Sequence, residues 1–317
     1  MQQTLYLRRL RDFGEKISDT FLFLKRNWAK LLGVYAVFVV PFLLIAIIVG
    51  AFFANHLYSV SLSSADSLRP GDIFTPEFFV IVLSLLMAGT SYNVAVYCYF
   101  RLYEEQKGEQ PVIQQVGQIF VKKFFRVFLY NILVAVALAL IFILPVVGLA
   151  MIPVLGPLIL FFGFLLGILF VMVVMFYLNC VFVVDDLGFS ASLSRLFYLL
   201  GNRWWNTIGF TLVIVIIYYV FAAVIQFAAG MIITFFSFSF LVPRTETGSS
   251  GHHIINIIAL VIGLAIMINQ VFYLIVFSGV GVNYYSLAEE KDGSAIEEQI
   301  DSIGEVSDKY GGIEEQY

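Results

Sequence analysis

Charged side chains are scarce in this sequence. Asp, Glu, Lys and Arg make up 13% of its 317 residues, against about 25% in a typical soluble domain. Hydrophobic residues make up 61%. A soluble fold of this length could not bury so many apolar side chains, so we expect lipid to be the solvent for much of the chain.

Signatures of chemistry are also missing. The chain contains no G-x-S-x-G, P-loop, Rossmann, H-E-x-x-H or CxxC motif, so we expect no catalytic site, metal site or cofactor. Cys98 and Cys180 lie in apolar runs, which favours two small buried hydrophobes over a disulfide. No N-x-[ST] sequon occurs, which weakly favours a bacterial membrane. Nucleic-acid binding has no support beyond basic residues that lipid already explains.

Six apolar stretches are long enough to cross a membrane, since a helix needs about 20 such residues to span ~30 Å of hydrocarbon. We therefore predict an all-α polytopic membrane protein, with a six-span domain over residues 1–287 and an acidic cytoplasmic tail over 288–317. The spans are expected at about 31–53, 78–100, 127–148, 157–182, 207–238 and 254–286.

The last two stretches exceed the length of a simple span, so these helices must tilt, break or project from the bilayer. Gly230, Gly279 and Gly281 are the expected weak points. Pro41 and Pro145 are expected to kink the first and third spans.

Lys and Arg are distributed unevenly between the connecting segments. The N-terminus, the 101–126 and 185–206 segments and the tail hold 16 of the 18 basic residues. The positive-inside rule then predicts both termini in the cytoplasm. The first 30 residues lack the apolar core of a cleavable signal, so the first span is expected to act as an uncleaved anchor.

A threefold internal repeat is predicted over about 12–108, 109–188 and 189–293. Each unit consists of a cytoplasmic amphipathic helix, two spans and an acidic pair followed by glycine. The acidic pairs lie in LYEEQKG, VVDDLG and LAEEKDG, and the segments before the first span of each unit read FLKRNWAKLL, FVKKFFRVFL and YLLGNRWWNTIG. In the first amphipathic segment Phe13, Ile17, Phe21, Leu24, Trp28 and Leu31 recur at three- and four-residue steps.

These segments suggest contacts at the cytoplasmic surface. Trp28, Phe125, Trp204 and Trp205 are candidate interfacial anchors, with basic neighbours that attract anionic lipid headgroups. A regulatory or partner-docking role for the helices stays open. The acidic pairs either end a helix that leaves the membrane or meet basic residues of a neighbouring unit, because acidic groups at a helix C-terminus oppose the helix dipole.

The segment VVDDLGFSASLSRLFYLLGNRWWNTIGF resembles a pattern in bacterial multi-pass proteins related to the membrane domain of glycerophosphoryl diester phosphodiesterases. The resemblance covers about 30 residues and implies a similar fold. The catalytic domain of those enzymes is absent, so the resemblance does not carry over their activity. The matching positions are Asp185, Asp186, Gly188, Ser194, Arg195, Gly201, Asn202, Arg203, Trp204 and Trp205.

No charged residue falls within the expected spans, which lowers the expectation of ion-coupled transport. The candidate polar contacts inside the membrane are the amides Asn93, Asn179, Asn269, Gln270 and Asn283. We interpret them as interhelical hydrogen-bonding groups, worth ~0.6–2 kcal/mol each, or as the lining of a polar cavity. The adjacent pair Asn269 and Gln270 is the best candidate for a site, because unpaired amides inside a span are costly.

The acidic tail suggests a further contact. Ser294 and Glu297 have capping-box spacing, and Ile296, Ile300 and Ile303 follow as a stripe. Such a short helix is marginal alone, so we expect it to dock on the basic cytoplasmic helices, on another protein, or on nothing stable.

The functional expectation is a non-enzymatic inner-membrane protein, a scaffold or accessory subunit of a membrane complex. Its expected partners are membrane lipids, including anionic headgroups, and other membrane proteins. The alternative is a carrier or flippase for a lipid or weakly polar solute. A cavity that holds Asn269, Gln270 or Asn93 would favour that alternative.

Overall fold

The computed structural model describes residues 5–63, 69–149, 155–241 and 249–293, and within these ranges it contains helices and no strand. The predicted all-α class is confirmed. Six helices in the described ranges are long and apolar enough to cross a membrane. The elements are α1 (Phe13–Phe38), α2 (Val40–Ser63), α3 (Pro70–Ile73), α4 (Pro76–Glu105), α5 (Ile113–Leu149), α6 (Leu155–Val184), α7 (Phe189–Leu200), the 3₁₀ helix η1 (Gly201–Arg203), α8 (Trp204–Leu241) and α9 (Ser249–Asp292).

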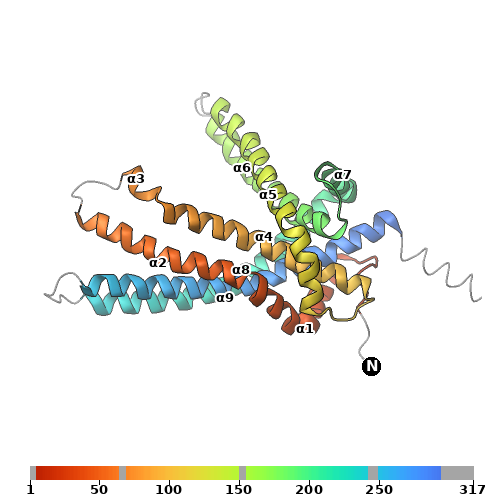
Figure 1. The fold of residues 1–317 in the computed structure, drawn as a ribbon. Coiled ribbons are helices and arrows are strands. Elements are labelled where there is room, and N and C mark those ends of the chain that lie inside the picture. The colour runs from red at the N-terminus through yellow and green to blue at the C-terminus, as the bar shows by residue number, and fades with distance from the viewer. Residues whose placement is uncertain (1–4, 64–68, 150–154, 242–248, 294–317) are drawn as a thin grey trace, which may run out of the picture.

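The long helices of the described chain form antiparallel pairs: α2 with α4, α5 with α6, and α8 with α9. The pairs meet at the end of the molecule where α1 and α7 lie, which we call the base (Figure 1). The first described residues and the end of α9 also lie at the base. Helix α1 packs against α9 and α4, so the start of the chain contacts its last long helix.

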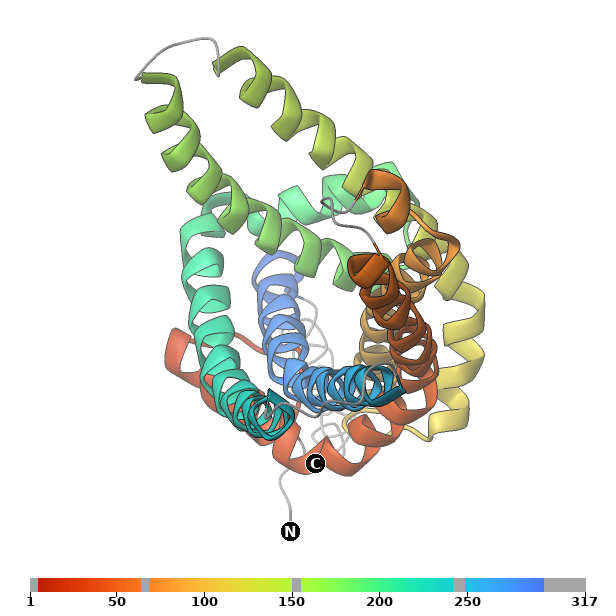
Figure 2. The same cartoon turned by 90° about the vertical axis from the view of Figure 1, so that its left-hand side faces the viewer.

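Away from the base the α5–α6 pair separates from the other helices, whereas α2 stays in contact with α9. The α5–α6 pair points away from α8 and α9 in both views (Figure 1, Figure 2). Burial follows the same division, because the buried residues of α4, α6 and α9 concentrate in the halves nearer the base. Large apolar side chains nearer the far end are exposed, with Leu140 at 57% and Phe227 at 70%. Among the described residues, those packed like a protein interior therefore concentrate at the base.

The first span differs from its expected position. Helix α1 continues to Phe38, and a break at Val39 separates it from α2. Pro41 lies at the second position of α2, where its missing N–H costs no helical hydrogen bond. The span expected at 31–53 therefore begins at Val40, and residues 31–38 belong to a helix of the base.

The expected weak points in the last spans do not interrupt them. Helix α8 passes through Gly230, and α9 passes through Gly279 and Gly281 without a break. Helix α5 also continues through Pro145. Two of these glycines have a packing role instead, because Gly279 faces Ile214 of α8 and Gly281 faces Phe100 of α4.

Helix α1 is buried on one face rather than lying wholly on a surface. Phe23 stacks on Phe100 of α4 with ring centroids 4.3 Å apart. Asn27 accepts a hydrogen bond of 2.7 Å from the Tyr99 hydroxyl. Asp19, which lies outside the apolar series of this segment, is 7% exposed and accepts a 2.6 Å hydrogen bond from Arg11. The apolar series therefore does not include every buried residue of α1. Polar residues such as Asp19 and Asn27 are buried as well, because other parts of the chain supply their hydrogen-bond partners.

The chain reverses at the base through backbone conformations that favour glycine. Gly108 after α4 has φ +93° and Gly293 after α9 has φ +66°. A left-handed residue of this kind commonly ends a helix, and glycine adopts it without steric cost. After α6 the conformation falls on Asp186, with φ +57°, and not on Gly188. The three acidic ends are thus similar in sequence but not identical in backbone.

A matched pair of glycine substitutions tests the packing of α9. A Cβ on Gly281 would lie 2.7 Å from the ring of Phe100, whereas a Cβ on Gly230 meets nothing within 4 Å. We expect Gly281→Ala to lose about 1–3 kcal/mol through overpacking, and Gly230→Ala to keep or raise stability through helix propensity. Thermal unfolding of the purified protein in detergent measures both. A Gly281→Ala protein as stable as the wild type would contradict this packing.

Candidate functional site

The acidic pairs of the sequence form ion pairs at the base. Glu104 lies 3.8 Å from Arg8, and Glu105 lies 2.7 Å from Arg101 of the same helix. Glu290 pairs with Arg203 at 2.6 Å. Each carboxylate stands at or near the C-terminus of a helix, where the helix dipole disfavours it, so the nearby cations offset an unfavourable placement.

The middle acidic pair connects different helices. Asp186 contacts Arg101 of α4 at 3.6 Å, and also Lys123, at 3.2 Å, and Arg126, both of α5. Asp185 lies 3.5 Å from Arg195 of α7 and accepts a 2.6 Å hydrogen bond from the Tyr284 hydroxyl of α9. Of these cations, Arg101 and Arg195 belong to neighbouring predicted units, whereas Lys123 and Arg126 belong to the same unit as Asp186. The acidic residues Glu105 and Glu290 also pair within their own predicted units.

Arg195 connects the second and third helical pairs. Besides Asp185, it contacts Asp292 at the end of α9 through both terminal nitrogens, with Nη1 to Oδ1 at 2.9 Å. A two-pronged contact of this kind fixes orientation as well as distance, because the guanidinium is planar and rigid. Tyr198 of α7 lies beside the same guanidinium, with its ring centroid 5.6 Å away.

A second polar layer lies within the spans near the base. Asn283 of α9 donates through Nδ2 to the Tyr177 hydroxyl of α6. Tyr177 in turn lies 3.4 Å from the Thr211 hydroxyl of α8. All three residues are at most 2% exposed. Asn283 therefore makes the interhelical hydrogen bond that its position suggests, and the contact joins α6, α8 and α9.

The other candidate amides do not gather into one site. Asn93 donates to its own helix at Gly89, at 2.8 Å, and Asn179 to its own helix at Met175, at 2.7 Å. Asn269 lies near Tyr218 of α8, and its buried Oδ1 has no hydrogen-bond partner among the described residues. Gln270 contributes its backbone carbonyl, which accepts a 2.7 Å hydrogen bond from Tyr92.

The candidate anchors fall into two groups. Trp28, Phe125 and Trp205 are 37%, 69% and 75% exposed, so their rings face the surroundings as an interfacial anchor requires. Trp204 instead stacks on Phe170 of α6, with centroids 5.0 Å apart. The stripe of Ile296, Ile300 and Ile303 lies outside the described residues. The two cysteines are both free and buried.

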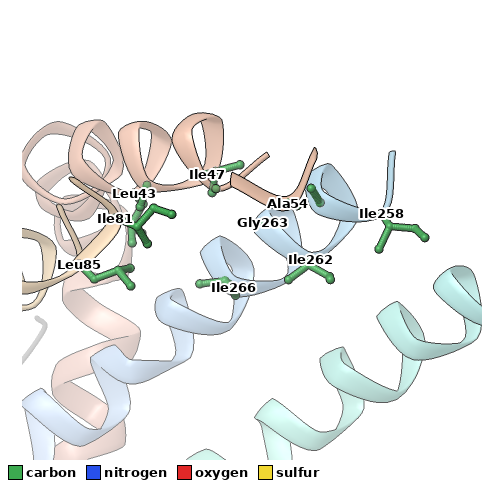
Figure 3. Close-up of a pocket in the computed structure, with 12 residues that line it drawn as sticks. Leu43, Ile47, Ala54, Ile81, Leu85, Ile258, Ile262, Gly263 and Ile266 are labelled. Carbon is green, nitrogen blue, oxygen red and sulfur yellow. The ribbon is translucent and has the colours of Figure 1, made fainter. Parts of the chain in front are cut away.

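An apolar pocket of about 320 Å³ lies between α2, α4 and α9 (Figure 3). It occupies the part of these helices away from the base. Every lining side chain is aliphatic or absent, so neither water nor a polar solute finds a hydrogen-bonding partner there. The lining residues are Leu43, Ala46, Ile47, Gly50, Ala54, Ile81, Leu85, Ile258, Ala259, Ile262, Gly263 and Ile266.

Reasoning from polar residues alone missed this pocket, although the sequence holds a signal for it. Ala46, Gly50 and Ala54 recur at four-residue steps on α2, and Ala259 and Gly263 do so on α9. Small residues at this spacing let helices approach closely in membranes. A Cβ on Gly263 would lie 2.6 Å from Ile47, whereas one on Gly50 meets nothing within 4 Å. Gly263 therefore marks the close approach and Gly50 the open space.

Comparisons with known proteins find no match: no family model, no curated protein and no solved structure resembles the chain. The resemblance to the membrane domain of glycerophosphoryl diester phosphodiesterases thus stays a prediction. Within the described residues, no group of three or more His, Cys, Asp or Glu side chains could hold a metal ion.

Loss of the Tyr177 hydroxyl tests the inner polar layer. Tyr177→Phe leaves the buried Asn283 amide without its acceptor, which we expect to cost about 1–3 kcal/mol. Tyr219→Phe, which removes a hydroxyl from a side chain 61% exposed, should have no effect in the same thermal unfolding measurement. Tyr177→Phe combined with Asn283→Leu should recover part of the loss, since removal of both partners leaves no unpaired group. If Tyr177→Phe unfolds at the same temperature as Tyr219→Phe, the hydrogen bond between Tyr177 and Asn283 does not stabilise the fold.

Acidification tests the ion pairs of Asp186. Partial burial alone would raise the pKa of Asp186, but the hydrogen bond from Arg126 and the charge of Lys123 outweigh it and hold the pKa below its ordinary value. A carboxyl with a lowered pKa in the folded state stabilises the fold at higher pH, and this contribution is lost as pH falls below about 4. Unfolding temperature against pH should therefore fall less steeply in Asp186→Asn than in the wild type.

The matched control for this measurement is Asp72→Asn, which removes the same charge from α3, at the end opposite the base. We expect Asp186→Asn to be the less stable of the two variants at neutral pH, because it leaves Lys123 and Arg126 without their shared carboxylate. Superimposable pH profiles for the two variants would show that Asp186 contributes no such stabilisation.

Proposed function

We propose that the chain is a non-enzymatic scaffold or accessory subunit of a membrane protein complex. One observation carries the proposal: away from the base, the membrane-spanning helices offer aliphatic and aromatic surface that the rest of the described chain does not cover. Helix association in membranes relies on close packing, and exposed side chains such as Leu140 and Phe227 make no such contact within the described chain. A partner's transmembrane helix would contact this surface, while the base holds the three helical pairs in place.

The proposed location is the inner membrane of a bacterium, with both termini in the cytoplasm. The described N-terminal residues and the end of α9 lie together at the base, as an even number of spans requires. Most basic residues of the sequence also belong to segments at the base, which supports a cytoplasmic base under the positive-inside rule. Anionic headgroups of the inner leaflet would lie beside Trp28, Phe125 and Trp205.

A carrier or flippase for a lipid is the second candidate, and the apolar pocket favours it. Its walls suit a hydrocarbon chain and not a polar solute. Neither this pocket nor the smaller one at the base, both formed by described residues, is lined by Asn93, Asn269 or Gln270. A carrier for a weakly polar solute is therefore less well supported than a carrier for a lipid chain.

Site-specific photocrosslinking in the native membrane tests the first proposal. A photoreactive amino acid replaces Phe227 of α8, which is 70% exposed away from the base, or Phe125 of α5, which is 69% exposed near the base. We expect a protein adduct of one discrete mass from position 227 and none from position 125. Purification in mild detergent should then recover the same partner in a fixed ratio.

A strictly monomeric protein in mild detergent, with only lipid adducts at both positions, would contradict a scaffold role. A monomer with only lipid adducts would favour the flippase if vesicles containing the protein also move labelled phospholipid across the bilayer faster than vesicles without it. Gly50→Leu is the variant that links that movement to the apolar pocket, because the new side chain would fill open space.

A further inference from the structure

A second pocket, of about 280 Å³, lies at the base where α1, the start of α8 and the end of α9 meet. It differs from the apolar pocket in its charge. Arg11, Lys16 and Arg203 contribute to its lining, against the two carboxylates of Asp12 and Glu290. The charged lining therefore carries one net positive charge.

The two carboxylates are already engaged by groups of the protein. Asp12 caps α1 by accepting a 2.7 Å hydrogen bond from the backbone N–H of Glu15. Glu290 accepts from Arg203 through Nε at 2.8 Å and Nη2 at 2.6 Å. That contact uses one edge of the Arg203 guanidinium and leaves its Nη1 for another acceptor, since a guanidinium has five N–H donors.

The three cations are not equivalent. Arg11 is fully committed, because it donates to Asp19 and to the carbonyl oxygens of Leu7 and Tyr6, each at 2.6 Å. Lys16 is half-buried and forms no ion pair within the part of the chain that the structure describes. The pocket thus presents one ammonium group without a carboxylate partner, close to Arg203.

The electrostatic environment of Lys16 favours an added anion. Burial lowers the pKa of Lys16; the charge of Glu290 opposes this shift, whereas Arg203 and Arg11 add to it. A half-buried ammonium group beside two guanidinium groups is destabilised by desolvation and by like charge. A bound anion would offset both effects and would meet charge-assisted donors on two sides.

The uncharged lining of the pocket is mixed, with Asn206 and Thr207 of α8 beside three apolar side chains. Phe13 of α1 and Phe210 of α8 pack edge to face with centroids 5.9 Å apart, and Leu287 of α9 lies beside them. Trp205, adjacent to the pocket residue Asn206, is 75% exposed, which is the placement of a tryptophan at a membrane interface. A ligand with a charged, hydrogen-bonding head and an apolar body would meet cations, polar side chains and apolar side chains here.

We infer that this pocket binds the phosphate of an anionic phospholipid headgroup, with Lys16 and the free edge of Arg203 as its cationic contacts. The ligand would reach the pocket from the membrane leaflet on the side of the base. The inference rests on the membrane location of the chain and not on the scaffold role, so either one can fail without the other.

Native mass spectrometry of the full chain in detergent, with defined phospholipids added, tests the inference. The probes are phosphatidylglycerol, which is anionic, and phosphatidylcholine, which is zwitterionic. We expect the wild type to retain phosphatidylglycerol preferentially. Lys16→Gln should weaken its binding about tenfold, as expected from the loss of one charge-assisted contact, whereas Lys16→Arg should retain most of it.

Two further variants separate the pocket from general surface charge. Lys25→Gln removes the same charge from an exposed position of α1 and should leave phosphatidylglycerol binding unchanged. Asn206→Trp fills the pocket mouth without a change of charge and should reduce binding as Lys16→Gln does. Unfolding temperatures like that of the wild type would show that each variant is folded, and recovery of binding in Lys16→Arg provides a second check.

Three results would overturn the inference. Equal losses in Lys16→Gln and Lys25→Gln would mean that lipid binds through diffuse charge. Full binding by Asn206→Trp would place the lipid elsewhere. Glycerol 3-phosphate, added without lipid, is the arm for a soluble source. If it binds as tightly as phosphatidylglycerol, the pocket recognises a free phosphate ester and the assignment to a lipid is wrong.

Discussion

The position of the third helical pair against the second depends on the contacts of Arg195. Its guanidinium lies between Asp185, directly after α6, and Asp292, at the end of α9. Asp186, the next residue, is held by Arg101 of α4 and by Lys123 and Arg126 of α5. Two adjacent carboxylates thus connect all three helical pairs at the base. The ion pairs described above all lie in this region, where charge-assisted contacts fix distance and orientation.

The rest of the architecture follows from where such contacts are possible. Hydrophobic burial drives helices together in water but not in lipid, because acyl chains are as apolar as leucine. Polar contacts at the base and the inner layer around Tyr177 therefore hold the three helical pairs together there, whereas α2 and α9 also pack against each other beyond them. The remaining apolar surface is available to lipid or to a partner. The aliphatic pocket between α2, α4 and α9 belongs to this second region, and the charged pocket beside Lys16 belongs to the first.

Composition and spacing predicted the helical class, the six apolar helices and the meeting of acidic pairs with cations. They could not predict that α1 packs into the base with polar residues buried. Asp19 and Asn27 can be buried because Arg11 and Tyr99 donate hydrogen bonds to them. Tyr99 is distant in the sequence, so no local pattern identifies it as a partner. The first span was expected to start at residue 31 and not at Val40, because residues 31–38 are also apolar. The apolar pocket was missed because aliphatic side chains look alike in sequence whether they pack against protein or line a space.

The base is the packed core of the protein, and away from it the α5–α6 pair stands apart from α8 and α9. Distance measurement between spin labels in lipid nanodiscs tests this arrangement most directly. Labels at Lys25 and Lys122, both at the base, should give a narrow distribution, and labels at Leu140 of α5 and Phe227 of α8 should give a long distance. A short, narrow distance between positions 140 and 227 would show a bundle packed along its whole length and would contradict the account.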